Sequence, residues 1–128
     1  MTGTRTGTRV AGALAGFAAA LPVTVMAVLE FGYIAGGGDP GWFGFARSMG
    51  VITGVMAAVL TVAASLVARG HASGALLIAL YGIGMMLLLA GGGTATGAAL
   101  ASFHGAISVL ELAVAYRLAR GHAPTEGP

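Results

Sequence analysis

Two stretches of this chain, residues 48–68 and 72–90, contain no charged side chain. Each is about as long as the roughly 20 apolar residues that a helix needs to cross the hydrocarbon core of a bilayer. Two further stretches, residues 10–35 and 97–118, are nearly as apolar. The sequence therefore predicts an all-α integral membrane protein, a four-transmembrane-helix bundle that forms a single domain over residues 1–128.

The composition supports a membrane environment and excludes several classes of function. Hydrophobic residues make up 57% of the chain and charged residues 8%, whereas soluble domains carry about 25% charged residues. A globule of this size cannot bury so much apolar surface in itself, so we expect the lipid bilayer to cover it. The absence of cysteine removes disulfides and thiolate sites. The arginines are scattered, without the basic stripe that nucleic-acid binding requires.

The positions of the arginines predict the orientation, because positively charged residues remain cytoplasmic. With the N- and C-termini both in the cytoplasm, five arginines lie inside and only Arg47 lies outside; the five are Arg5, Arg9, Arg69, Arg117 and Arg120. We expect a multi-pass protein of the plasma membrane, of bacterial origin given its arginine-only basic set, with a mobile polar tail at residues 119–128. A secretory signal is the alternative for the first stretch, but its apolar character continues to Ile34, longer than such a signal.

The chain also contains two similar halves. Residues 53–72 and 104–123 both end in ARGHA, and AGGG occurs at 35–38 and again at 90–93. One interpretation is a duplicated helical hairpin. The other is that Arg and Gly are each common where a helix ends, and that a chain with 23 glycines matches itself by chance.

Small residues predict which faces of the helices pack together, since helices in lipid associate by close packing of small side chains. One face of the second stretch carries Gly50, Gly54, Ala58, Thr61 and Ser65. A stripe of small or polar residues in the fourth stretch comprises Gly97, Ala101, His104, Ser108, Glu111 and Ala115. We expect both sets to face protein.

Ionisable residues within the apolar stretches are the candidate functional residues. A charged side chain at the centre of a membrane helix costs about 3 kcal/mol, so Glu111 needs a partner or a proton. Matching depths at 1.5 Å per residue places Thr61 and Tyr81 near its level. The same matching puts Glu30 and His104 on the order of 8–10 Å below the outer surface, within reach of Arg47.

Two interpretations of these groups remain open. In one, Glu30, Arg47, Tyr81, His104 and Glu111 mark an ion, proton or ligand path. In the other, a neutral Glu111 donates to Tyr81 or Thr61 and fixes the helix register, while Glu30 and Arg47 form an ion pair. Neither interpretation requires a metal or a cofactor, and no metal-binding motif is present.

Three functions are compatible with these sequence features. We expect a helix-bundle subunit that binds or supports partners in the membrane, either as a homo-oligomer or with another membrane protein. The alternative is an oligomeric proton- or ion-coupled transporter or channel. In size and helix number the chain is similar to small multidrug-resistance transporters, which use a carboxylate in the first helix, although no signature motif aligns. A membrane enzyme with a His104/Glu111 acid–base pair comes third, and the chain is not expected to be an enzyme.

Overall fold

The computed structural model of the chain describes residues 2–121, and helices are its only regular elements over that range. In chain order they are α1 (Thr2–Ala35), the short 3-10 helix η1 (Pro40–Trp42), α2 (Phe43–Ala68), α3 (Ala72–Ala90) and α4 (Ala95–Arg120). All four α-helices are long and apolar enough to cross a membrane. The predicted all-α fold with four such helices is confirmed. Most of the predicted polar tail, residues 122–128, lies outside the described residues.

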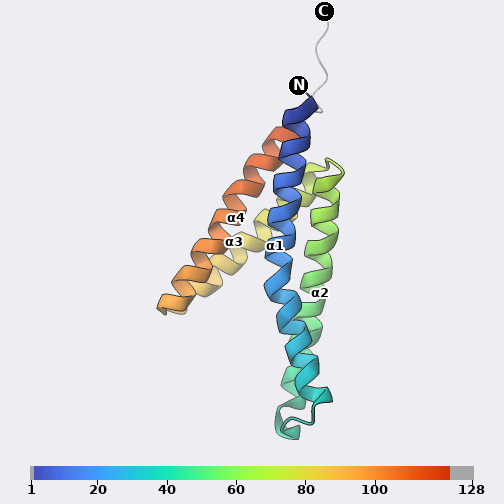
Figure 1. Cartoon of the computed structure of the whole chain (residues 1–128). Helices are drawn as coiled ribbons and strands as arrows, with labels where there is room; N and C mark the ends of the chain where they lie inside the picture. Colours follow the sequence, from blue (N-terminus) through green and yellow to red (C-terminus); the bar gives the residue numbers. More distant parts are fainter. Residues whose placement is uncertain (1, 122–128) are drawn as a thin grey trace, which may run out of the picture.

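The helices form two hairpins, α1 with α2 and α3 with α4 (Figure 1). The turn that joins the hairpins lies at the same end of the molecule as the start of α1 and the end of α4. All arginines except Arg47 belong to this end, which we call the arginine-rich end. The turns within the hairpins lie at the opposite end, the loop end.

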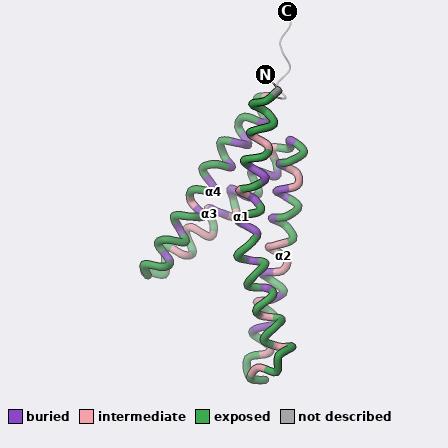
Figure 2. The backbone as a smooth tube through the Cα atoms, viewed as in Figure 1, coloured by how far each residue is buried: buried purple, intermediate pink, exposed green. Residues whose placement is uncertain are grey.

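The hairpins share a core only in the part of the molecule nearer the arginine-rich end. α2 contributes buried core residues only from Leu60 onward, α3 only up to Ile78 and α4 only from Ile107 onward, while α1 contributes none beyond Val23. Beyond these positions the hairpins diverge, so that the molecule is V-shaped (Figure 1). Much of the chain near the loop end is exposed on the outer faces of the hairpins (Figure 2).

Small residues allow the close approach on which the shared core depends. Four alanines, Ala19, Ala63, Ala64 and Ala75, are completely buried. Between α3 and α4 the contact is closer still, since a Cβ at Gly82 would lie 2.9 Å from the backbone oxygen of His104 and would overlap the Ser108 hydroxyl. The Ser108 hydroxyl donates to the carbonyl oxygen of Ala79 at 3.2 Å and to that of His104 at 2.9 Å. Packing and a hydrogen bond therefore both hold the second hairpin together.

The small-residue face predicted for α2 coincides with its fully buried face only at Gly50, which packs on the ring of Phe31. Gly54 and Ser65 are half-buried, and Ala58 and Thr61 are exposed. The buried face of α2 is instead made of larger and smaller side chains together: Ala46, Gly50, Thr53, Leu60, Ala63, Ala64 and Val67. Within the single chain, most of the predicted face is therefore available to lipid or to another subunit.

The glycines of the two ARGHA segments, Gly70 and Gly121, adopt different backbone conformations. Gly70 has φ +91° in the turn between α2 and α3, a conformation that favours glycine, and His71 then starts α3. Gly121 has φ −71° at the end of α4 and stays in the right-handed region. The internal repeat remains a prediction.

The α3–α4 contact predicts the effect of adding one methyl group. We expect Gly82→Ala to destabilise the protein by about 1–3 kcal/mol, because the backbone of α4 blocks the space for the new Cβ. Gly84→Ala is the matched control in the same helix: nothing lies within 4 Å of its Cβ position, so we expect a change within about 0.5 kcal/mol. Reversible unfolding in micelles, followed by circular dichroism, measures both. Equal effects of the two variants would contradict the close contact.

Candidate functional site

The polar residues of α4 lie on its buried face. Its polar and small positions, Gly97, Ala101, His104, Ser108, Glu111 and Ala115, are all buried, and so are Ile107, Val114 and Leu118. The stripe therefore faces protein along its whole length. Toward the loop end it contacts α3, and from Ile107 onward it enters the core that all four helices share.

Glu111 is the most deeply buried ionisable residue among those described, with no exposed surface. Core residues lie one turn away on each side of it in α4, Ile107 before it and Val114 after it. Both carboxyl oxygens are buried, and neither has a hydrogen-bond partner among the described residues. A carboxylate left charged in such a place carries a large desolvation cost, so the arrangement favours a bound proton or cation.

The two partners predicted for Glu111 do not hydrogen-bond to it. Thr61 is exposed on α2, and its hydroxyl donates to the carbonyl oxygen of Ala57 in its own helix. Its neighbour Leu60 is the residue that enters the core, which turns Thr61 away from α4. Tyr81 packs against the core, but its ring lies edge-on to His104, with the centroids 5.7 Å apart.

His104 is 4% exposed and lies two turns from Glu111, toward the loop end. Its ring is held between aromatic neighbours, Tyr81 of α3 and Phe103 of its own helix, the second with centroids 5.2 Å apart. Its Nδ1 atom is buried and has no hydrogen-bond partner within the described part of the chain. Ser108, which lies between His104 and Glu111 in the sequence, directs its hydroxyl proton to the backbone oxygens of Ala79 and His104. His104 and Glu111 are therefore two separate unpaired polar groups on one buried face.

Glu30 and Arg47 lie at the loop end of the other hairpin. Half-buried Glu30 lines a cavity of about 320 Å³ with Tyr33, Trp42, Phe45 and Ala46. Arg47 is exposed, and no ion pair joins it to Glu30 or to any other residue described. The predicted outer ion pair is therefore not formed: the half-buried Glu30 lines the cavity, whereas Arg47 is exposed and does not line it. Likewise, His104 belongs to the hairpin that diverges from Glu30 (Figure 1).

These groups do not form a metal centre. Over residues 2–121, no group of three His, Asp or Glu side chains is arranged to hold a metal ion. What the core offers chemically is one carboxyl group and one imidazole nitrogen, each buried and unpaired. Such groups can bind and release a proton or accept a hydrogen bond from a polar ligand or partner.

Three arginines form a cluster at the arginine-rich end. Matching depths along the sequence did not predict this cluster. Arg5 and Arg9 from the start of α1 and Arg117 from the end of α4 line a common cavity of about 80 Å³. In the sequence Arg117 is more than 100 positions from the other two arginines. Only the hairpin topology, which returns the end of α4 to the start of α1, could have predicted the cluster.

Comparison of the chain with protein-family models, with curated proteins and with solved structures finds no match.

Proposed function

We propose that this chain is a helix-bundle subunit of the bacterial plasma membrane that binds a transmembrane helix of another subunit between its two hairpins. The observation that carries this proposal is the restriction of the shared core to the half near the arginine-rich end. Toward the loop end the hairpins diverge and leave helix faces that no part of the described chain covers (Figure 1). By the positive-inside rule, that open half faces the outer leaflet.

Large apolar side chains of α4 remain uncovered beyond the shared core. One and two turns before Ile107 are Phe103 and Leu100, which are 40% and 44% exposed. Phe103 and Leu100 lie in line with Ile107 along α4, and their large side chains give another helix a surface to pack against. Lipid also covers apolar side chains, so apolar character alone does not distinguish a partner from the bilayer.

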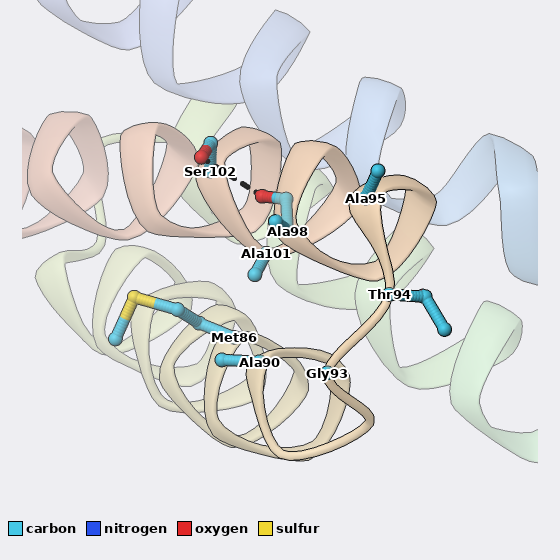
Figure 3. Close-up of a pocket in the computed structure, with 8 residues that line it drawn as sticks. All are labelled: Met86, Ala90, Gly93, Thr94, Ala95, Ala98, Ala101 and Ser102. Carbon is cyan, nitrogen blue, oxygen red and sulfur yellow. Dashed lines mark hydrogen bonds between the residues drawn. The ribbon is translucent and has the colours of Figure 1, made fainter.

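Small residues supply the second line of support. At the loop end of the second hairpin, a groove of about 570 Å³ is lined mainly by glycine and alanine, with Met86, Thr94 and Ser102 (Figure 3). On α2, Gly54 and Ala58 lie four residues apart on a face that is open to contact. Small residues at this spacing let the backbone of a neighbouring helix approach closely. Both surfaces are suited to packing against a transmembrane helix.

Site-specific photo-crosslinking tests this proposal. A photoreactive benzoylphenylalanine replaces Phe103 or Leu100 in cells of the native host, and Val109 of the same helix, which is 70% exposed, is the control. We expect one discrete protein adduct from Phe103 and Leu100 and none from Val109, because only the first two lie in line with Ile107. The mass of the adduct shows whether the partner is a second copy of this chain or another protein. Crosslinks to lipid alone at all three positions would overturn the proposal.

Proton- or ion-coupled transport is the second candidate, and the observation that favours it is the unpaired carboxyl group of Glu111. A buried carboxyl group without a structural partner marks an ion or proton path more often than a scaffold contact. His104, two turns closer to the open half, provides a second group that can exchange a proton. The open half between the hairpins would give access from the outer side.

The transport candidate predicts a selective loss in one variant. In vesicles loaded with a pH-sensitive dye, we expect Glu111→Gln to reduce proton uptake to the rate of protein-free vesicles, because an amide cannot carry the proton. Asp39→Asn is the matched control, since Asp39 is an exposed turn residue. Proton uptake that is equal in both variants and in the wild type would exclude Glu111 as the coupling group. Circular dichroism of each variant verifies the fold.

A further inference from the structure

Three guanidinium groups line one small cavity at the arginine-rich end. Arg5 and Arg9 come from the first turns of α1 and Arg117 from the last turn of α4, and with Leu118 and Gly121 they enclose about 80 Å³. Arginine is always charged in proteins, so three positively charged residues line this cavity. Like charges at short range repel one another unless an anion lies between them.

The described part of the chain supplies no such anion. Of the four acidic residues, Glu30 and Asp39 lie at the loop end, Glu111 is buried in the core, and Glu126 lies outside the described residues. No carboxylate among the described residues forms an ion pair with Arg5, Arg9 or Arg117. The cluster is therefore uncompensated within residues 2–121.

The hydrogen bonds of these arginines leave most of their donors for a ligand. Arg5 donates from one Nη to the carbonyl oxygen of Gly121 at 2.8 Å, which uses one of its five N–H groups. The guanidinium of Arg9 lies over Gly70 of the α2–α3 turn, where even a Cβ would approach it to 2.8 Å. Its Nε atom is buried and has no hydrogen-bond partner among the described residues. Arg9 is thus fixed in place by packing while a buried donor remains unused.

The length of α1 predicts that the cavity lies at the depth of the lipid phosphates. The apolar part of α1 starts at Val10, directly after Arg9. The 34 residues of α1 extend about 51 Å, well beyond the roughly 30 Å of the hydrocarbon core, so its first turns project into the headgroup region. Basic pockets between transmembrane helices on the cytoplasmic side bind anionic headgroups.

A second, mainly apolar groove lies beside Arg9 along α1. Arg9 also lines a second cavity of about 270 Å³, whose other walls include Val10, Ala13, Leu14 and Phe17 of α1 and Ala68 of α2. Arg9 therefore lines both a charged cavity and a mainly apolar groove along α1. A soluble phosphate would use only the charged cavity, whereas a phospholipid would use both.

We propose that this cavity binds the phosphate of an anionic phospholipid, with Arg5, Arg9 and Arg117 holding the headgroup and the groove along α1 holding an acyl chain. Arginine suits this role because its planar guanidinium binds phosphate oxygens through two parallel hydrogen bonds. The proposal is independent of any partner helix at the loop end, since the two surfaces lie at opposite ends of the molecule.

Native mass spectrometry of the delipidated full-length protein in a neutral detergent tests the site. The protein is titrated with dioleoylphosphatidylglycerol, with dioleoylphosphatidylcholine and with inorganic phosphate alone. The variants are Arg9→Gln and Arg117→Gln, which change different helices, and Arg69→Gln is the matched control, an exposed arginine of the same end that does not line the cavity. A further variant, Glu126→Gln, tests whether the carboxylate of the tail competes with the lipid for the cavity.

We expect phosphatidylglycerol to bind more tightly than phosphatidylcholine, and either cavity variant to bind it about tenfold more weakly than the wild type, since each removes charge-assisted hydrogen bonds. Arg69→Gln should change the affinity less than twofold. Affinities that fall equally in all three arginine variants would overturn the site. Equally arginine-dependent binding of inorganic phosphate would overturn the lipid as its occupant, and a large gain of affinity in Glu126→Gln would assign the cavity to the chain's own carboxylate.

Discussion

The close packing of alanines where all four helices meet is the interaction on which the rest of this structure depends. In a bilayer no hydrophobic force drives helices together, because lipid tails are as apolar as leucine. Association then requires backbones close enough for van der Waals contact, and the fully buried Ala19, Ala63, Ala64 and Ala75 provide that closeness. The packing holds the hairpins together at one end and leaves them free to diverge at the other (Figure 1).

The position of Glu111 follows from this arrangement. The fourth helix carries its polar residues on the face that enters the shared core, so the fold of the chain buries the carboxyl group away from lipid. The core around it is apolar, however, and supplies no hydrogen-bond partner among the described residues. A residue that reduces the stability of a core without serving its structure is best explained by a function of the carboxyl group or of a partner that reaches it.

Much of the fold was predictable from the sequence, because length and apolar character define membrane helices and glycine-rich turns separate them. The buried face of α4 was predictable as well, because its small and polar residues recur at helical spacing. The face of α2 that enters the core was not. Thr61 matches Glu111 in depth, but Leu60 faces the core and Thr61 faces outward. The small-residue face predicted for α2 differs from the face buried within the chain at all but Gly50, since small residues suit contacts within a chain and between chains equally well.

The arginines illustrate the same limit. Their sequence positions predict on which side of the membrane they lie, whereas the meeting of Arg5, Arg9 and Arg117 depends on which helix ends are neighbours. That information belongs to the packing of α1 against α4 and to the close turn at Gly70, and neither leaves a local signal in the sequence.

The most direct test of the central claim, that the hairpins join at one end only, is a pair of distances between spin labels in lipid nanodiscs. The chain contains no cysteine, so introduced cysteines are the only labelled sites. One pair, Ala35→Cys with Ala90→Cys, marks the two hairpins at the loop end, and the other, Ala68→Cys with Ala119→Cys, marks them at the arginine-rich end; all four positions are exposed. The account predicts a clearly longer distance for the first pair. Equal distances for the two pairs, as in a parallel four-helix bundle, would contradict it.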